Sequence, residues 1–290
     1  MNYRHIYHAG NFADVFKHAV LALVIERLKL KDAAFRVIDT HAGIGVYDLG
    51  SEAAQKTGEW RGGIGRLLGP GAEPLPPAVA KLLEPYLSVV RRFNPAFDQA
   101  GEIVRYPGSP KLARELLRPQ DRMVVNELHP EDVRTLQGAF ARDDQVKVTE
   151  LDGWVALKAQ LPLKERRGVV LIDPPFEEPG EFGRLVRALG EAEKRFATGV
   201  YILWYPIKDR RPVDAFKREL KATGIAKLVT AEMWIRSGAD PVVLNGTGLV
   251  IHNPPFEIDR QLGVLGPFLA QRLGLEKGAR WSLEGLSGGG

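Results

Sequence analysis

The sequence contains no cysteine, and this absence excludes several kinds of chemistry at once. Disulfides, thiolate nucleophiles, iron–sulfur clusters and cysteine-bound zinc all require that residue. A long apolar segment is lacking too, because the longest apolar run near the N-terminus covers only residues 19–25, whereas a membrane span needs about 20 residues. No apolar signal core precedes that run. We therefore expect a cytoplasmic protein with no membrane partner.

A strong charge of one sign is also absent, because 40 basic residues against 36 acidic ones leave a net charge of +4. This slight excess permits a polyanionic partner without requiring one. The 290 residues suffice for one large α/β domain with an insertion, or for two small domains. Their 44% hydrophobic and 26% charged content is typical of a folded globular chain.

Short apolar runs alternate with helical patterns along the chain, which favours a mostly parallel sheet with helices on both faces. A helix is expected over residues 14–29. The runs that predict strands buried on both faces are residues 35–38, 123–125, 169–172, 200–204 and 249–251, with 146–151 as a weaker sixth. We expect the last of these strands, 249–251, to run antiparallel at the end of the sheet.

Residues 51–104 differ from the rest of the chain because glycine and proline interrupt their first half and a helical stripe follows. The stripe runs from Val79 to Phe93, and Pro85 within it predicts a kink or two short helices. We therefore predict a helical insertion over 51–104, with residues 1–50 and 105–290 forming the sheet domain. The glycine-rich tail, 287–290, is expected to be disordered.

The strongest chemical motif is Asp173-Pro174-Pro175-Phe176, which directly follows the apolar run 169–172. Proline cannot continue a central strand and holds the preceding residue extended, so the strand must stop with the Asp173 carboxylate aimed outward. Asp173 and the Pro174 carbonyl can accept the two hydrogens of an aromatic amino group while Phe176 stacks on the ring. Two acceptors make the nitrogen lone pair available as a nucleophile. The alternative is a purely structural Pro-Pro turn.

Other polar groups follow the remaining predicted strands. Asp39, His41 and Gly43 form a glycine turn after residues 35–38, where the backbone can approach a nucleotide-like ligand. Glu127 closes the run 123–127, where its carboxylate can accept bonds from two ribose hydroxyls, and Asp152-Gly153 closes the run 146–151, where it can bond an adenine ring. Each pattern also fits an ordinary turn or a solvated acid, and Asp152-Gly153 by itself favours the plain turn.

Asn253-Pro254-Pro255-Phe256 provides an internal control, because it also follows an apolar run, 249–251. If that strand is antiparallel, its carboxyl end faces away from the crevice in which ligands bind. We therefore predict that Asn253 is not catalytic.

Four of the six histidines lie early, but no carboxylate is spaced to complete a tetrahedral metal site with them, so we expect no metal. Lys17 and His18 instead suit an anionic or carboxylate-bearing ligand. The basic cluster after residues 200–206 contains Lys208, Arg210 and Arg211, which are candidate contacts to phosphate. A solvated surface explains this cluster equally well.

Together these segments resemble a Rossmann-like class I methyltransferase that uses S-adenosylmethionine, of the amino-methylating type with a D-P-P-[FYW] loop. The resemblance extends to one family, RlmJ, the bacterial 23S rRNA adenine-N6 methyltransferases. The blocks that carry it are Tyr3-Arg4-His5, His8-Ala9-Gly10-Asn11, Ala13-Asp14-Val15, Lys17-His18, Asp39-Thr40-His41-Ala42-Gly43, Tyr106-Pro107-Gly108-Ser109-Pro110, Glu127-Leu128-His129-Pro130, Leu171-Ile172-Asp173-Pro174-Pro175-Phe176 and Phe196-Ala197-Thr198-Gly199. Members often carry tyrosine where Phe176 stands and a small residue where Ile44 stands.

The resemblance implies methylation of a specific adenine in 23S rRNA, adenine 2030 in that family. It implies that Asp173 is the catalytic acceptor and that Tyr3 contacts the RNA. The implied contacts to S-adenosylmethionine are His18, His41, Ser109, Glu127, Asp152 and Gly153. We add Lys17, Asp39, Gly43 and Asp173 to this cofactor set from their positions, and Pro174 and Phe176 to the catalytic set. A monomer would suffice.

Two other functions stay open at this point. DNA adenine-N6 methylation uses the same base, although no separate DNA-recognition domain is evident in the sequence. A nucleotide- or RNA-binding module without catalysis is the alternative from another class. Protein glutamine methylation is disfavoured, because aspartate rather than asparagine opens the loop at position 173.

Overall fold

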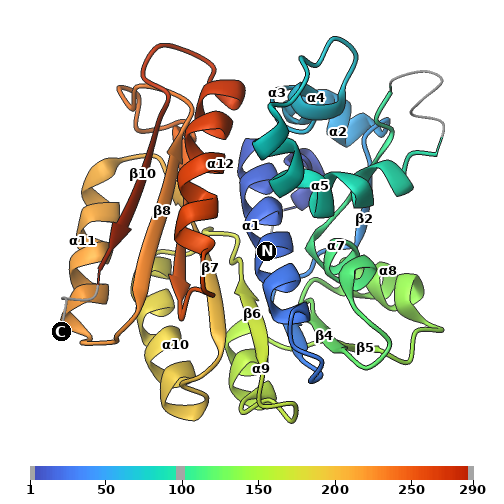
Figure 1. Cartoon of the computed structure of the whole chain (residues 1–290), viewed down its shortest axis with the longest axis vertical. Coiled ribbons are helices and arrows are strands. Elements are labelled where there is room, and N and C mark those ends of the chain that lie inside the picture. The colour runs from blue at the N-terminus through green and yellow to red at the C-terminus, as the bar shows by residue number, and fades with distance from the viewer. Residues whose placement is uncertain (1–3, 96–101, 287–290) are drawn as a thin grey trace.

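One eight-stranded sheet forms the centre of the protein in a computed structural model that describes residues 4–95 and 102–286 (Figure 1). In spatial order the strands are β10 (Arg280–Gly285), β8 (Leu228–Trp234), β9 (Gly246–His252), β7 (Val200–Ile207), β6 (Gly168–Ile172), β1 (Arg36–Asp39), β4 (Arg122–Asn126) and β5 (Val146–Thr149). The five strands from β7 to β5 are parallel. β9 runs antiparallel to both of its neighbours, and β10 runs antiparallel to β8. The mostly parallel Rossmann-like α/β sheet is thus confirmed.

All six predicted strands are present, but the expected end of the sheet is wrong. β9 is antiparallel as predicted, yet it lies between β7 and β8 rather than at the edge. Sequence reasoning missed β8 and β10, which extend the sheet beyond it. β8 contains Glu232, which is fully buried and bonded to Arg210 and Tyr205, so a charged residue interrupts the apolar run that would have predicted the strand.

Helices cover both faces of the sheet and build two separate cores. The larger core contains residues of α1 (Phe12–Lys29), α5 (Pro77–Arg92), α7 (Ser109–Leu116), α8 (Pro130–Phe140) and α12 (Ile258–Leu273). The second core contains α9 (Gly153–Gln160), α10 (Glu181–Arg195) and α11 (Arg210–Ala222). Figure 1 shows α1 and α12 on one face, with α10 and α11 on the other.

Helix α1 has no solvent face along most of its length. Its residues from Phe12 to Ile25 are all buried, because α5, α7 and α12 pack on the side that the sheet does not cover. Asn11 caps its first turn by accepting bonds from the amides of Ala13 and Asp14, at 2.9 and 3.0 Å. The polar residues that α1 carries near this end are therefore held inside the protein.

The segment between β1 and β4 contains short helices and a small two-stranded sheet. Its elements, with the N-terminal turn that contacts them, are η1 (His5–Tyr7), β2 (Val46–Asp48), α2 (Glu52–Thr57), α3 (Glu59–Gly62), α4 (Gly65–Leu68) and β3 (Arg105–Pro107). β2 and β3 pair antiparallel, and α5 packs against α1. α5 is a single helix with Pro85 inside it, so of the two predicted outcomes the pair of short helices is wrong and the kink stays a prediction. The predicted tail 287–290 lies outside the described residues.

The parallel strands end together at one edge of the sheet. The residues that follow β1, β4, β6 and β7 therefore meet there, although they are far apart in the sequence. Among the described residues, no helix is long and apolar enough to cross a lipid bilayer.

Candidate active site

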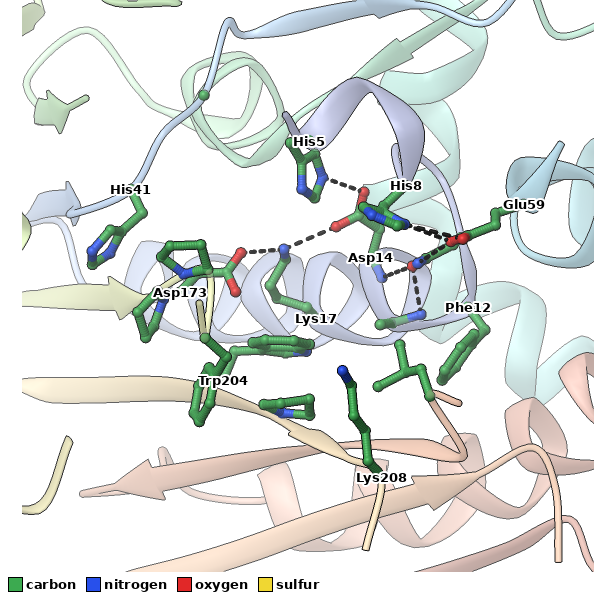
Figure 2. A pocket seen from close by; sticks show the side chains of 18 of the residues that line it. His5, His8, Phe12, Asp14, Lys17, His41, Glu59, Asp173, Trp204 and Lys208 are labelled. Atoms are coloured by element: carbon green, nitrogen blue, oxygen red, sulfur yellow. Dashed lines mark hydrogen bonds and ion pairs between the residues drawn. The ribbon is translucent and has the colours of Figure 1, made fainter. Parts of the chain in front are cut away.

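A cleft of about 1110 Å³ opens at the carboxyl edge of the parallel strands. Its lining includes residues of the first turn of α1, the loops after β1, β4, β6 and β7, and the connection between β8 and β9. Figure 2 shows side chains from α1 and from the loops after β1, β6 and β7 around one space, with Asp173 pointing toward Lys17. The sequence-predicted residues that line this cleft are Lys17, His18, His41, Gly43, Ser109, Glu127, Asp173, Pro174, Phe176 and Lys208.

The Asp173-Pro174-Pro175-Phe176 loop leaves β6 at the point the prolines predicted. Every residue of β6 is buried, and the Asp173 side chain is 14% exposed at its end. Phe176 adopts a left-handed backbone conformation, with φ of 51°, which is costly for an aromatic residue and is typical of functional loops. Its ring packs edge-on against Phe182 and Trp204, with centroids 5.0 and 5.8 Å apart. The loop is thus braced at both ends.

A chain of ion pairs, which sequence reasoning missed, holds Asp173. The Lys17 ammonium bonds an Asp173 carboxylate oxygen, and its distance to Asp14 Oδ1 is 2.9 Å (Figure 2). Asp14 Oδ2 in turn lies 2.9 Å from His5 Nε2 and accepts the Gly10 amide at the same distance. Aspartate and lysine three residues apart on a helix are a pairing signal, and Asp14 and Lys17 have that spacing.

The charge states in this chain follow from burial and pairing. Burial alone would lower the pKa of Lys17, but the carboxylates of Asp14 and Asp173 raise it above its ordinary value. Burial would likewise raise the pKa of Asp14, yet the charges of His5 and Lys17 hold it well below its usual range. Lys17 is therefore a fixed cation between two carboxylates.

The turn after β1 combines a buried acid with a glycine in the left-handed backbone region. Ser109 Oγ, which lines the cleft, donates to Asp39 Oδ2 at 2.6 Å, and burial raises the pKa of Asp39 to about 7. Asp39 itself lies behind the lining. Gly43 has φ of 62°, and a Cβ there would lie 2.1 Å from the Tyr47 hydroxyl oxygen. A side chain at this position would be strained by the positive φ and would displace the Tyr47 hydroxyl.

Glu127 is oriented by backbone amides from two segments. Its Oε2 accepts the Gly43 amide at 2.8 Å, and its Oε1 accepts the amides of Leu128 and His129, each at 2.8 Å. A carboxylate has about four acceptor positions, so one remains for a ligand hydroxyl. Glu127 thus lies beside the glycine turn, although Gly43 and Glu127 are 84 positions apart in the sequence.

The two histidines of the predicted cofactor set are both held in position. His18 Nδ1 lies 2.7 Å from the Tyr106 hydroxyl, and burial lowers the pKa of His18 to about 3. His41 Nδ1 lies 2.9 Å from Thr40 Oγ1, and burial lowers the pKa of His41 to about 4. Both rings are therefore neutral at physiological pH and can exchange hydrogen bonds with a ligand.

Asp152 and Gly153 lie beside the cleft rather than in its lining. Asp152 caps α9 by accepting the amides of Trp154 and Val155 at 3.0 and 3.1 Å. A Cβ on Gly153 would lie 2.4 Å from His41 Nε2, so this glycine keeps the His41 ring in place. Their assignment as cofactor contacts stays a prediction.

The predicted RNA contacts are separated by the structure. Lys208 lines the cleft, whereas Arg210 and Arg211 do not. Arg210 is paired with Asp214 and Glu232, and Arg211 with Asp209. Tyr3 lies outside the described residues. The roles of all four stay predictions.

The cleft fits S-adenosylmethionine in its chemistry. The Gly43 backbone lines the cleft, Glu127 has an acceptor position for a ribose hydroxyl, and neutral His41 lines the same cleft. Within residues 4–95 and 102–286, no group of three histidine, aspartate or glutamate side chains is arranged to hold a metal ion.

Comparisons with known proteins agree with this site. The family described as "Ribosomal RNA large subunit methyltransferase D, RlmJ" matches residues 32–285. A protein of Escherichia coli named ribosomal RNA large subunit methyltransferase J is 42% identical, with 94% of each chain covered. A protein of the same name from Haemophilus influenzae is 41% identical, with 99% of each chain covered.

A crystal structure of a protein from Legionella pneumophila shares the fold, with a TM-score of 0.84, 31% identity, and coverage of 96% of this chain and 98% of that one. The family match includes every strand of the sheet and the cleft loops that follow them, and the two relatives above 40% identity cover at least 94% of the chain. The chain therefore belongs to the RlmJ family of ribosomal RNA large subunit methyltransferases.

Proposed function

We propose that this protein transfers a methyl group from S-adenosylmethionine to N6 of an adenine in 23S ribosomal RNA. The observation that carries the proposal is the position of Asp173, whose carboxylate enters the same cleft as Gly43, Ser109 and Glu127. The names of the two relatives support ribosomal RNA as the substrate. The adenine at position 2030 is the one that the family resemblance indicates.

Asp173 and Pro174 would act on the amino group. The carboxylate and the Pro174 carbonyl accept its two hydrogens, which localises the nitrogen lone pair for attack. When bound, S-adenosylmethionine would supply the electrophilic methyl group, whose bond to sulfur breaks so that S-adenosylhomocysteine leaves. The nitrogen gains a bond to carbon and releases one proton, for which the hydrogen-bonded Asp173 carboxylate is the acceptor.

Lys17 would hold the Asp173 carboxylate in the orientation that this role requires. Turning the carboxylate away would break its ion pair with the Lys17 ammonium. Lys17 also lies between Asp173 and Asp14, so its ammonium separates the two carboxyl groups. The geometry therefore presents an oriented acceptor to the cleft.

Phe176 would hold the base by stacking. Extruding an adenine from an RNA helix costs a few kcal/mol, and stacking on an aromatic ring returns about 1–3 kcal/mol. Phe182 and Trp204 support the Phe176 ring, so little conformational entropy is lost when a base arrives. All cleft residues come from one chain, so the proposal requires no second copy.

The test uses purified wild-type protein and Asp173→Ala with transcribed 23S rRNA and labelled S-adenosylmethionine. We expect label in N6-methyladenine at one site for the wild type and none for the variant. Calorimetry should show that the variant still binds S-adenosylhomocysteine. Undiminished methylation by Asp173→Ala would disprove the mechanism.

Duplex DNA and the second Pro-Pro-Phe loop provide the controls for this experiment. Methylation of duplex DNA but not of rRNA by the wild-type protein would support the alternative substrate. Cofactor binding without transfer to any nucleic acid would support a non-catalytic module. Asn253→Ala, in the similar loop at the opposite edge, should methylate rRNA like the wild type.

A further inference from the structure

One wall of the cleft has no part in the chemistry proposed above. It consists of the end of β7 and the connection between β8 and β9, and we call it the β8–β9 wall. The members that line the cleft are Pro206, Lys208, Ile235, Arg236, Pro241, Val242, Val243 and Leu244. Because β7 and β8 point the same way, both strands bring their carboxyl ends to the edge where Asp173 lies.

The buried residue Asn245 bonds the backbone of both cationic residues of this wall, Lys208 and Arg236. Asn245 is 1% exposed, and its side-chain amide donates to the Lys208 carbonyl at 2.8 Å and to the Asp240 carbonyl at 2.6 Å. The Asn245 carbonyl accepts the amides of Ile235 and Arg236 at 2.9 and 3.3 Å. Lys208 and Arg236 are therefore anchored at the backbone while their side chains stay on the cleft side.

Lys208 and Arg236 are available to bind an anionic ligand. The other lysine in the lining, Lys17, has two carboxylate partners. Within residues 4–95 and 102–286, no ion pair engages the side chain of Lys208 or Arg236, although both line the cleft. The hydrogen bond with Glu59 raises the pKa of His8, and the positive charge of Lys208 partly offsets this rise.

Most acids that line the cleft are already engaged. Glu59 bonds His8 and Asn11, Asp132 pairs with Arg4, and Asp209 pairs with Arg211. Glu177 is the exposed exception, and it belongs to the Asp173 loop rather than to the β8–β9 wall. The wall thus presents two unpaired positive charges.

Beside the cations lies an apolar ledge formed by residues 241–244. Val242 is 78% exposed, and Val243 and Leu244 are half-buried, yet all three line the cleft. An exposed apolar side chain next to unpaired cations fits a ligand that has both a negative charge and a flat apolar surface. A nucleotide has both features.

We propose that the β8–β9 wall binds the nucleotide adjacent to the target adenine. Lys208 and Arg236 hold its phosphodiester, and the ledge of residues 241–244 holds its base. This inference rests on the proposed function, because an adenine delivered to Asp173 brings the neighbouring phosphodiester to the mouth of the same cleft. A contact of this kind positions the RNA strand and does not act on the methyl group.

The test compares Lys208→Ala/Arg236→Ala with a control that removes the same charges elsewhere. Arg218→Ala/Lys221→Ala is matched, because both residues are exposed on α11, outside the cleft lining. The probe is a fluorescein-labelled RNA hairpin with the target adenine in its loop, and its Kd is measured by anisotropy over a range of salt concentrations. Calorimetry with S-adenosylhomocysteine verifies the cofactor site.

We expect the Lys208/Arg236 variant to bind the hairpin about 10- to 100-fold more weakly at low salt, with the salt slope reduced by about 0.7 for each lost phosphate contact. KM for the RNA should rise while kcat stays within about twofold of wild type. The control should match wild type in Kd, salt slope, KM and kcat. Unchanged Kd and salt slope in the Lys208/Arg236 variant would overturn the proposal, as would a loss confined to kcat.

Failure of this inference and failure of the proposed function give different results. If the wild type methylates the hairpin but the Lys208/Arg236 variant binds it equally well, only the β8–β9 wall assignment is wrong. If the wild type binds the hairpin without methylating it, the catalytic proposal is wrong, whereas the binding comparison still decides the role of the wall.

Discussion

The chain contains two loops of nearly the same sequence at opposite edges of one sheet. Asp173-Pro174-Pro175-Phe176 follows β6, and Asn253-Pro254-Pro255-Phe256 follows β9. Each loop contains one non-glycine residue in the left-handed region, with φ of 51° at Phe176 and 50° at Asn253. β9 runs antiparallel to β7, so its carboxyl end points away from the cleft.

The surroundings of the two loops differ as their positions require. Asp173 pairs with Lys17 inside the cleft, whereas the Asn253 amide donates to the carbonyls of Ala197 and Gly199, at 2.6 and 2.9 Å. The Phe176 ring packs on aromatic neighbours, but Phe256 is 80% exposed beside Arg27. A short motif therefore acquires its role from the direction of the strand that precedes it.

Exchanging the first residues of the two loops should produce the largest effect. Asp173→Asn keeps the side-chain volume but removes the charge that accepts a proton, so we expect kcat to fall about 10²- to 10⁴-fold. Asn253→Asp should leave kcat within about twofold of wild type. Methylation kinetics on 23S rRNA measure both variants. Equal losses in the two variants would mean that strand direction does not separate the loops.

The same difference shows what the sequence could reveal. Asp173, Glu127 and Gly43 were found because prolines, glycines and acids at strand ends have local signatures. The Lys17–Asp173 ion pair was not found, because it joins residues 156 positions apart whose contact depends on how α1 packs on the sheet. β8 was missed for a similar reason, since the distant Arg210 and Tyr205 satisfy its buried Glu232.

The aromatic residues of the two loops provide the next test. Phe176→Ala removes a stacking surface worth about 1–3 kcal/mol, so we expect kcat/KM for rRNA to fall about 5- to 150-fold. Phe256→Ala removes an exposed ring and should change neither kcat/KM nor the unfolding free energy by more than about 0.5 kcal/mol. Steady-state kinetics measure kcat/KM of both variants, and urea unfolding measures their stability. A substantial kinetic loss in Phe256→Ala would contradict the comparison.

The ionisation of acidic side chains also distinguishes the Asp173 edge of the sheet from the Asn253 edge, because acids gather at the carboxyl ends of the parallel strands. Burial raises the pKa of Asp39 to about 7, and the charge of Asp173 adds to the effect. The unfolded carboxyl ionises near 3.8, so the folded state loses stability as the pH rises from there to about 7. Asp39→Asn should remove this loss.

We therefore expect the unfolding free energy of Asp39→Asn, relative to wild type, to increase by about 1.4 kcal/mol per pH unit between about pH 5 and pH 7. Above that range the difference should level off. Urea unfolding at several pH values measures it, with Asn253→Asp as a comparison at the other edge. Parallel pH profiles for wild type and Asp39→Asn would show that Asp39 is ionised throughout.

The smallest expected effect on activity concerns the Asn253 loop, whose variants should lose stability instead. Asn253→Gly keeps the left-handed backbone accessible but removes the two hydrogen bonds to Ala197 and Gly199, and we expect the unfolding free energy to fall by about 1–3 kcal/mol. Asn253→Ala adds the cost of a left-handed Cβ, so it should be less stable than Asn253→Gly by about 1 kcal/mol. Both variants should methylate rRNA at the wild-type rate below their unfolding transitions. Urea unfolding and parallel activity assays measure the two effects. A loss of activity without a loss of stability would show that the Asn253 loop takes part in catalysis, which its strand direction argues against.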